Sequence, residues 1–299
     1  MALLANKFFT PNVVPYYSFI PYFYSVIAIN YFYPYITYLH KLGSTEMIKL
    51  NSLSTKAPEH LKKDEIKEKT KELVKRIGEL SEVMHAEKKH ALLIVLQAMD
   101  GSGKDSTVKN VLGKVNPVAI TTVGYNKPTD EEFAHDFLWR IHKNTPRKGM
   151  IQVFVRSHYE DILVQRVHKW IDEERVSNRI DAINAFEKLL VFDNNTSVLK
   201  FYLHISLEEQ EMQLTERVTE PEKFWKHNDG DWEERKLWDN YMFCYEDAIN
   251  RCNAVPWNVV ASDARWYRDY VIAGKIVEAM EAMDCEYPAL KSELFPKKS

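Results

Sequence analysis

The chain is poor in cysteine, has no excess of basic residues and contains no low-complexity linker. Its 299 residues include three cysteines and carry a formal net charge of −3 at pH 7. This balance argues against a general nucleic-acid binder, whose surface is strongly basic, but it leaves room for a local basic groove. Cys244, Cys252 and Cys285 have neither metal-ligand spacing nor the density of a disulfide scaffold. We therefore expect reduced thiols, a cytoplasmic location and no nucleic-acid partner.

Two further absences bear on metal binding and domain organisation. The histidines form no His-Glu-x-x-His or similar zinc-binding motif, and the sequence has no internal repeat. We expect one domain over residues 47–283, followed by a C-terminal tail over residues 284–299.

The first 46 residues differ in composition from the rest. Between Phe8 and Leu39 there is no charged residue, and Phe, Tyr, Ile and Asn dominate. About 20 apolar residues suffice to cross a bilayer, but Pro15, Pro21 and Pro34 interrupt this segment. It also lacks the basic start and the cleavage site of a signal peptide. We favour a translated upstream segment or dispensable arm before a start at Met47, over a packing or oligomerisation arm and over a membrane element.

The most informative motif is a glycine-containing turn after an apolar run. Residues 91–96 read Ala-Leu-Leu-Ile-Val-Leu, and residues 98–106 read Ala-Met-Asp-Gly-Ser-Gly-Lys-Asp-Ser. Glycines let backbone N–H groups converge on phosphate oxygens, the next helix directs its N-terminus at them, and the lysine reaches the outer phosphates. The predicted phosphate-binding residues of this loop are Gly101, Ser102, Gly103, Lys104, Asp105 and Ser106.

The loop departs from the usual phosphate-binding pattern at three positions. Ala98 replaces the first glycine, Asp105 replaces the Ser or Thr that normally holds Mg²⁺, and Asp100 has entered the loop. We interpret it as a phosphoryl-transfer site whose metal is held differently from that of an ordinary ATPase. Asp100 is the candidate metal residue.

Apolar runs alternate with helical patterns along the rest of the chain. An amphipathic helix over 64–89 precedes expected strands at 91–99, 119–125, 150–155, 198–205 and 257–261. Further helices are expected at 104–114, 130–143, 157–172, 179–193, 207–218, 231–252 and 264–283. A capping box at Thr129 precedes the second of these. Continuously apolar strands alternating with helices indicate a parallel sheet covered on both faces. The fold class is therefore α/β, a P-loop kinase-like three-layer α/β/α sandwich with a five-stranded parallel sheet.

Charged residues follow the third expected strand. Arg156 comes directly after Val155, at a strand end whose side chains face the ligand crevice of an open α/β sheet. Its planar guanidinium suits phosphate oxygens. The alternative is that Arg156 only pairs with Glu160 or Asp161 in the following helix.

A second charged segment lies over residues 217–235, which are rich in aromatic residues and interrupted by Pro221 and Gly230. We predict a helical lid that closes over phosphates and expels water. Its positive charge would come from Arg217, Lys223, Lys226 and Arg235. A solvated surface loop is the alternative.

These segments together resemble the polyphosphate kinase 2 family. The matching stretches occur in order across roughly residues 60–283. They are Leu-Gln-Ala-Met-Asp100-Gly-Ser-Gly-Lys104-Asp105, His135-Asp136-Phe-Leu-Trp139-Arg140, Arg156-Ser-His-Tyr-Glu160-Asp-Ile-Leu-Val, Trp225-Lys226, Trp238-Asp-Asn-Tyr-Met-Phe-Cys-Tyr245-Glu246-Asp247-Ala, and Pro256-Trp257 followed by Trp266-Tyr-Arg268. The loop with both Asp100 and Asp105 is specific to this family, and the Arg-Ser-His-Tyr-Glu form resembles its class III members.

The resemblance implies a phosphotransferase. Such an enzyme moves a phosphoryl group between inorganic polyphosphate and nucleoside mono- or diphosphates, converting AMP and ADP to ADP and ATP, with GMP and GDP as alternative acceptors. The resemblance also implies Mg²⁺ as cofactor, with Mn²⁺ as an alternative, and assembly into a homodimer or homotetramer.

The resemblance and the residue chemistry give each candidate a role. We expect Asp100, Lys104, Arg156 and Arg217 to be catalytic. Asp100 would bind Mg²⁺ through water, the two arginines would neutralise the transferred group, and Lys226 would hold the polyphosphate chain. The acceptor nucleotide would lie near Asp136, Arg140 and Glu160.

Two positions depart from the family pattern. The family usually has Asp or Asn where this chain has Val155, and it commonly places a lysine one residue before Lys127. Two other functions therefore stay open. An ATP-dependent nucleotide kinase would be favoured by Ser or Thr at position 105 and an acidic residue at position 155, and neither is present. A polyphosphate- or nucleotide-binding protein with weakened catalysis has Val155 as its best argument.

Overall fold

The computed structural model describes residues 47–292 together with residues 294 and 295. The predicted extension over residues 1–46, with its three interpretations, lies outside the described residues. Within the described ranges, no helix is long and apolar enough to cross a membrane.

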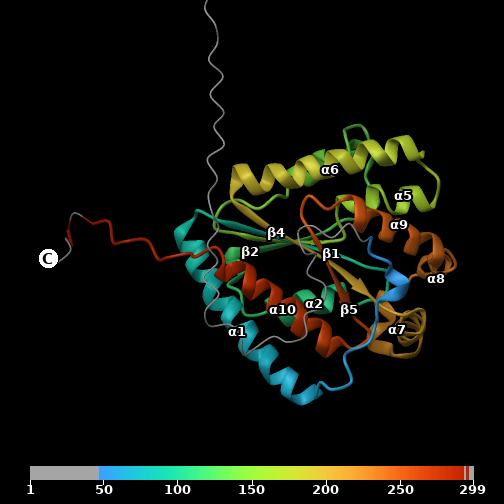
Figure 1. The fold of residues 1–299 in the computed structure, drawn as a ribbon, viewed down its shortest axis with the longest axis horizontal. Coiled ribbons are helices and arrows are strands. Elements are labelled where there is room, and N and C mark those ends of the chain that lie inside the picture. The colour runs from blue at the N-terminus through green and yellow to red at the C-terminus, as the bar shows by residue number, and fades with distance from the viewer. Residues whose placement is uncertain (1–46, 293, 296–299) are drawn as a thin grey trace, which may run out of the picture. The chain divides into compact units, whose positions relative to one another are not determined.

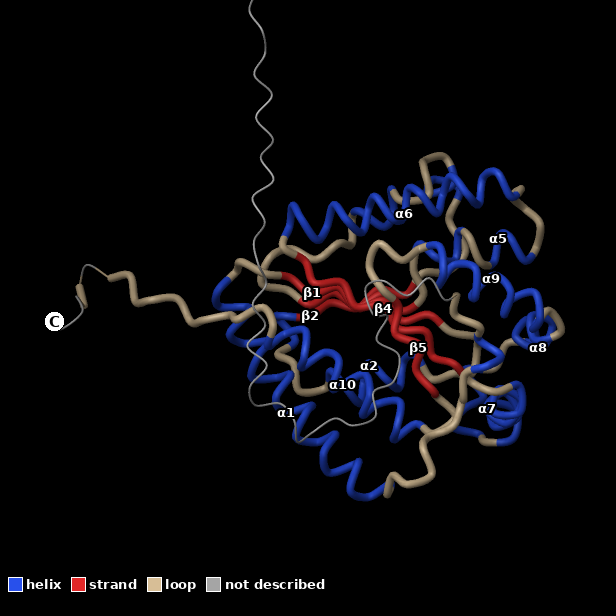
Figure 2. Tube along the Cα trace, viewed as in Figure 1, coloured by secondary structure: helices blue, strands red, loops and turns tan. Residues whose placement is uncertain are grey.

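A five-stranded, all-parallel sheet forms the centre of the domain (Figure 2). Its strands are β1 (Ala91–Gln97), β2 (Ile120–Gly124), β3 (Ile151–Val155), β4 (Thr196–His204) and β5 (Trp257–Ala261). Their order in the sheet is β2-β3-β1-β4-β5, which places β1 at the centre. All seven residues of β1 are buried, as its unbroken apolar sequence predicts. The predicted parallel sheet is confirmed, and so is the position of β3 beside the strand that leads into the glycine loop.

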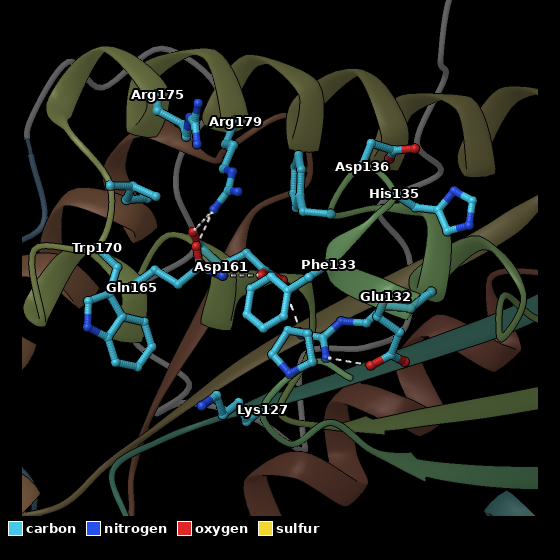
Figure 3. A pocket seen from close by; sticks show the side chains of 14 residues that line it. Lys127, Glu132, Phe133, His135, Asp136, Asp161, Gln165, Trp170, Arg175 and Arg179 are labelled. Carbon is cyan, nitrogen blue, oxygen red and sulfur yellow. Dashed lines mark hydrogen bonds and ion pairs between the residues drawn. The ribbon is translucent and has the colours of Figure 1, made fainter. Parts of the chain in front are cut away.

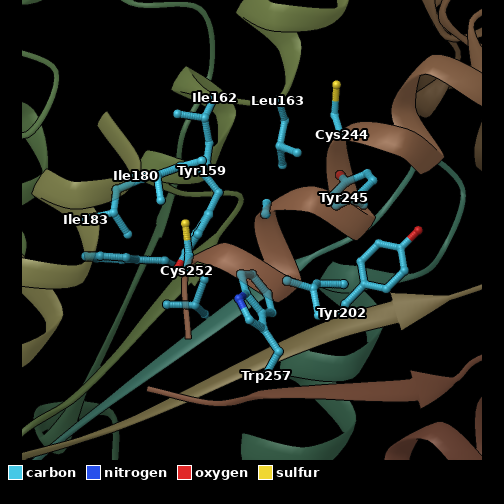
Figure 4. Packing of buried hydrophobic residues seen from close by; sticks show 14 of the residues in the cluster. Tyr159, Ile162, Leu163, Ile180, Ile183, Tyr202, Cys244, Tyr245, Cys252 and Trp257 are labelled. Carbon is cyan, nitrogen blue, oxygen red and sulfur yellow. The ribbon is translucent and has the colours of Figure 1, made fainter. Parts of the chain in front are cut away.

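Helices cover both faces of the sheet (Figure 1). One face carries α1 (Lys63–Glu87), α2 (Lys104–Leu112) and α10 (Arg265–Glu281), and the other carries α6 (Glu173–Asn194) and α9 (Trp238–Arg251). Successive residues of β1 point to opposite faces, so Leu92 and Ile94 pack with the first helix layer, whereas Leu93 and Val95 pack with the second. The hydrophobic cluster that contains Leu93 and Val95 is rich in aromatic side chains, and Figure 4 shows part of it. The expected three-layer α/β/α sandwich is confirmed.

A buried charge pair, Lys200 and Glu187, lies beside Tyr159 and Cys252 of this hydrophobic cluster. Lys200 of β4 is fully buried and donates to Glu187 of α6 at 2.7 Å, to Tyr159 Oη at 2.7 Å and to the carbonyl oxygen of Cys252 at 2.8 Å. Tyr159 Oη in turn donates to Glu187 at 2.6 Å. Hydrogen bonds to every partner offset the desolvation of the two charges. The pair links α6 to the segment that follows β3.

Three of the predicted helices are divided. The helix expected over 130–143 is two short turns, α3 (Asp130–Phe133) and α4 (Trp139–His142). The capping box at Thr129 is present, but the Asp136 carboxylate accepts a hydrogen bond from the backbone N–H of Leu138 at 3.0 Å and interrupts the helix.

The other two divided helices are those expected over 157–172 and 231–252. The helix expected over 157–172 is a 3₁₀ turn over His158–Asp161 followed by α5 (Val164–Val167), and α6 then begins six residues earlier than expected, after Asp172. The Asp172 carboxylate caps α6 by accepting from the backbone N–H of Arg175 at 2.8 Å. The helix expected over 231–252 is α8 (Asp229–Arg235) and α9.

Candidate active site

The turn after β1 has the conformation that phosphate binding requires. Gly101 and Gly103 adopt φ angles of 85° and 84°, in the left-handed region that glycine enters without a Cβ clash. Helix α2 begins at Lys104, so its N-terminus opens onto the turn. The Lys104 ammonium group is held by the carbonyl oxygens of Ala98 at 2.9 Å and Met99 at 3.2 Å. The sequence thus folds into the predicted phosphate loop.

Arg268 of α10 supports this loop. Its buried guanidinium donates to the carbonyl oxygen of Ser102 at 2.9 Å and to Ser106 Oγ at 3.2 Å. The Asp269 carboxylate fixes the same guanidinium through hydrogen bonds of 3.0 and 2.8 Å. We did not predict this positioning role. The only signal in the sequence was the match of Trp266-Tyr-Arg268 to the family pattern.

Arg156 joins the loop from the neighbouring strand. It follows β3 with a φ of 61°, and its Nη2 donates to Asp100 Oδ1 at 2.6 Å. The carboxylate to which Arg156 donates is therefore Asp100, and Glu160, one of the two partners in the alternative, interacts with Arg156 through its charge. The charge of Asp100 raises the pKa of Arg156 above its ordinary value. Arg156 is thus a fixed cation at the loop.

Asp100, Lys104 and Glu160 form a cluster of charges with Arg156. Burial raises the pKa of Asp100, but the charges of Lys104 and Arg156 outweigh it, and the net pKa lies below the ordinary value. Burial lowers the pKa of Lys104, opposed by the charge of Asp100. Burial also raises the pKa of Glu160, opposed by Arg156 and Lys104. Asp100 is accordingly ionised at neutral pH.

The loop opens into a cavity of about 520 Å³, which we call the loop cavity. Its walls come from the glycine loop, the ends of β2 and β3, and the segment predicted as a lid. Its cationic lining residues are Lys104, Arg156, Arg217, Lys223, Lys226 and Arg265, and its carboxylates are Asp100, Asp105, Glu216 and Asp231. The excess of cations fits an anionic ligand. Val155 also lines this cavity, so the position at which the chain departs from the family pattern faces the ligand space.

The predicted lid is helical. It comprises the end of α7 (Leu207–Thr219), the 3₁₀ segment η4 (Pro221–Lys226) and α8. Arg217 donates to the Asp231 carboxylate, which joins α7 to α8 across the cavity mouth. Gln210 of α7 donates from Nε2 to the carbonyl oxygen of Asp100 at 3.0 Å and so links the lid to the glycine loop.

One predicted lid charge lies elsewhere. Arg235 donates to the carbonyl oxygen of Leu207 at 2.8 Å and to the Glu211 carboxylate at 2.6 Å, and it is not among the residues that line the loop cavity. Its role is to fasten α8 to α7. By contrast, Lys226 lines the cavity as predicted, beside Trp225, whose side chain is 79% exposed.

A second cavity, of about 620 Å³, lies beside α4 and the start of α6 (Figure 3). We call it the aromatic cavity because Phe133, His135, Phe137 and Trp170 line it. Its charged lining residues are Lys127, Glu132, Asp136, Arg140, Asp161, Arg175 and Arg179. In Figure 3 the side chains of Arg175 and Arg179 approach this space from the helix drawn above it. Asp136 and Arg140, predicted on the acceptor side, are thus brought together here.

A short backbone segment separates the two cavities. Asn126 lines the loop cavity, and Lys127, the next residue, lines the aromatic cavity. Arg140 holds this segment by donating to the carbonyl oxygen of Asn126 at 2.9 Å, and it also pairs with Asp161 at 3.3 Å. Arg179 donates to the carbonyl oxygen of Asp161 at 2.6 Å. Sequence reasoning missed Arg175 and Arg179, because no motif marks them.

Two predicted site residues are not among the lining residues of either cavity. The Ser102 side chain is buried and donates to the carbonyl oxygen of Met99 at 2.7 Å. The predicted role of Ser102 rests on its backbone N–H and stays a prediction. Glu160 lines neither cavity. Its electrostatic partners are Arg156 and Lys104, which place it with the phosphate loop rather than with Asp136 and Arg140.

Comparisons with known proteins bear on this site. The family model described as Polyphosphate kinase 2 (PPK2) matches residues 60–288. The chain belongs to the polyphosphate kinase 2 family. It is 43% identical over 218 residues to the AMP/ADP-polyphosphate phosphotransferase of Meiothermus ruber, covering 72% of this chain and 81% of that protein. It is 35% identical over 263 residues to the ADP-polyphosphate phosphotransferase of Rhodopseudomonas palustris, covering 83% and 91%.

A solved structure agrees with this assignment. The crystal structure of polyphosphate kinase 2 from Arthrobacter aurescens TC1 superposes with a TM-score of 0.80 at 35% sequence identity. The match covers 84% of this chain and 91% of that one. The fold seen here is therefore that of the polyphosphate kinase 2 family, as the sequence resemblance indicated.

Proposed function

We propose that the protein transfers a phosphoryl group between inorganic polyphosphate and nucleoside mono- or diphosphates. The observation that carries this proposal is the pair of cavities on either side of Asn126 and Lys127, one lined by cations around a phosphate loop and the other by aromatic rings. The names of the relatives, which describe AMP/ADP- and ADP-polyphosphate phosphotransferases, support the substrate classes.

In this proposal the loop cavity holds the polyphosphate. Lys104 and the backbone N–H groups of the glycine loop bind the phosphoryl group to be transferred, and Arg156 neutralises its equatorial oxygens. Arg217 and Lys226 extend the cationic surface along the rest of the chain. Phosphoryl transfer depends mainly on positioning and charge stabilisation, and the residues of this cavity supply both.

The acceptor nucleotide occupies the aromatic cavity. Phe133 and Trp170 offer ring faces for the base, and Lys127 and Arg175 offer charge for its phosphates. Asp136 and Arg140 shape the same space. The acceptor phosphate then meets the donor at the boundary near Asn126, where the two cavities adjoin.

The residues of the loop cavity fit a magnesium ion held by Asp100. Asp100 is an ionised carboxylate beside the phosphate loop, and Mg²⁺ is commonly held by one or two carboxylates together with substrate phosphates and water. When bound, the ion would neutralise charge on the phosphates; Mn²⁺ has the same oxygen preference and is the alternative. Asp100, already held by Arg156, is the residue that would orient it.

The proposal is tested by measuring nucleotide formation with the full chain, polyphosphate, Mg²⁺ and either AMP or ADP. We expect polyphosphate-dependent ADP or ATP, and a loss of about 10³-fold or more in Lys104→Met. Two matched variants test the assignment of the cavities. Lys226→Met should raise KM for polyphosphate alone, whereas Lys127→Met should raise KM for the nucleotide alone.

Two results would replace this proposal. Transfer from ATP but not from polyphosphate would identify an ATP-dependent nucleotide kinase. Binding of polyphosphate and nucleotide without turnover, by protein shown to be folded, would identify a binding protein in which Val155 has removed catalysis. A cytoplasmic location and a homodimer or homotetramer stay predictions.

A further inference from the structure

The end of the sheet opposite the phosphate loop carries a cluster of three different donor types. Glu87 ends α1, His90 immediately precedes β1, and Cys285 follows α10. His90 Nδ1 lies 2.9 Å from Glu87 Oε2 and 3.6 Å from Cys285 Sγ. Among the described residues, this is the one group of three His, Cys, Asp or Glu side chains whose donor atoms all lie within 4.8 Å of one another.

Two backbone turns bring these residues together. Lys88 adopts a φ of 58° at the end of α1 and donates its N–H to the carbonyl oxygen of Met84 at 3.1 Å, so the chain reverses between Glu87 and His90. Asp284 adopts a φ of 49° after α10 and turns the next residue, Cys285, toward β1. Figure 1 shows the chain after α10 passing beside the end of α1. Non-glycine residues rarely adopt such φ angles, so both turns are specified by the fold.

The arrangement resembles a coordination shell more than a catalytic triad. In a triad the thiol and the carboxylate contact different nitrogens of the imidazole, but here both lie closest to Nδ1. Tetrahedral zinc with bonds of about 2.3 Å to sulfur and 2.0–2.1 Å to nitrogen separates the two donor atoms by about 3.6 Å. The observed separation of Cys285 Sγ from His90 Nδ1 has this value. The same geometry separates nitrogen and oxygen ligands by about 3.4 Å, so Glu87 Oε2, now 2.9 Å from His90 Nδ1, must move away from it by about 0.5 Å.

The surroundings also suit a bound cation. The Glu87 side chain is only 5% exposed and its Oε1 accepts from Lys89, whose own side chain is 70% exposed and free to swing into water. His90 is 29% exposed, which leaves a path for entry and for a water molecule as fourth ligand. A set of one thiolate, one imidazole and one carboxylate selects zinc over magnesium or calcium, which prefer oxygen ligands.

We propose that Glu87, His90 and Cys285 form a Zn²⁺ site that fastens the C-terminal segment to the start of β1. Zinc displaces the thiol proton to solvent and adds bonds to sulfur, nitrogen and oxygen, with no redox change. The seven residues of β1 separate this site from the phosphate loop by about 23 Å. The site therefore acts on stability and not on the transfer reaction.

The test uses the metal-stripped full chain without substrates. Co²⁺ serves as a spectroscopic probe, because its charge-transfer absorption reports a thiolate ligand. We expect one Co²⁺ per chain with this band, displacement by Zn²⁺, and a melting temperature that rises with Zn²⁺ concentration. Cys285→Ser should abolish the band and weaken Zn²⁺ affinity by about 100-fold or more, and His90→Gln should weaken it similarly.

Control variants separate this site from other causes. Cys244→Ala removes a thiol outside the cluster, and Asp100→Asn removes the proposed magnesium-binding carboxylate of the loop cavity; both should retain the band. Circular dichroism without metal establishes that each variant is folded. The proposal fails if no thiolate band forms in the wild-type chain, or if Zn²⁺ stabilises Cys285→Ser as much as wild type. In that case the three side chains are a hydrogen-bonded contact only.

Discussion

The guanidinium group of Arg268 packs against Gly103 so closely that a Cβ atom at position 103 would overlap Nη1. Position 103 therefore requires glycine for two reasons. Its φ angle is left-handed, and the space beside it is too small for a methyl group. Gly101 has the same φ angle, but a Cβ there would meet its nearest neighbour, Gln213 Cβ, at 3.4 Å, an ordinary contact. An alanine at position 101 would thus introduce backbone strain alone, whereas an alanine at position 103 would introduce both backbone strain and steric overlap.

This difference predicts unequal effects of two otherwise identical substitutions. Gly101→Ala should cost about 1–2 kcal/mol of stability through backbone strain, with partial activity retained. Gly103→Ala adds displacement of Arg268 and should lower activity at least a further 10-fold. Thermal unfolding and polyphosphate-dependent ATP formation measure the two effects. Equal losses in both variants would show that Arg268 does not position the loop.

Val155 offers a substitution that should improve the enzyme. It lines the loop cavity where the family usually has an acidic or amide residue, so Val155→Asp places a carboxylate near Lys104 and Arg156. We expect the Mg²⁺ concentration for half-maximal activity to fall by roughly 10-fold. Val155→Ala, which adds no oxygen, is the matched control. An unchanged Mg²⁺ requirement in Val155→Asp would mean that other groups already supply this contact.

The buried pair of Lys200 and Glu187 predicts a strongly non-additive double-mutant cycle. Lys200→Met or Glu187→Leu alone leaves one buried charge without its partner and should cost about 3–5 kcal/mol. The double variant removes both charges and should lie within about 2 kcal/mol of wild type. Urea unfolding of the four proteins gives the coupling energy. Additive losses would contradict a direct interaction between the two charges.

His204 predicts a loss of stability in mild acid. Burial lowers its pKa below the ordinary value of 6.5, and its Nδ1 has no hydrogen-bond partner within the described part of the chain. Below pH 6.5 the unfolded state therefore binds more protons than the folded state, and the free energy of unfolding falls as pH falls. Full stability is present above this value.

The measurement compares urea unfolding at pH 7.5 and 5.5. The His204 contribution is at most about 1.4 kcal/mol per pH unit. His204→Gln lacks the titrating group, so its stability should change less between the two conditions. An equal change in the variant would assign the acid sensitivity to other residues.

The parts of the fold that depend on local pattern were predictable. The buried run of β1, the glycines and Lys104 together specified a phosphate loop, and the alternation of elements specified a parallel sheet. Helix interruptions were harder, because the sequence is equally compatible with Asp136 inside a helix and with Asp136 accepting from the backbone N–H of Leu138 between α3 and α4. The pattern of hydrophobic residues does not distinguish these two cases.

Contacts between distant residues were beyond the reach of the sequence. Arg268 lies 166 positions from Ser102, and Cys285 lies 195 positions from His90. A search for ligand spacing examines near neighbours, so it correctly found no motif around Cys285 and still missed the cluster. Likewise, Arg156 was predicted to face the ligand crevice, but its contact with Asp100 depends on the sheet order, which places β3 beside β1.

The separation of the two cavities by Asn126 and Lys127 has a kinetic consequence under the proposed function. Because donor and acceptor enter different spaces, the phosphorylated nucleotide need not displace the polymer in order to leave. The polymer can advance by one phosphate along the cationic surface while the nucleotide exchanges. The geometry therefore favours processive shortening of a single chain over release after each turnover.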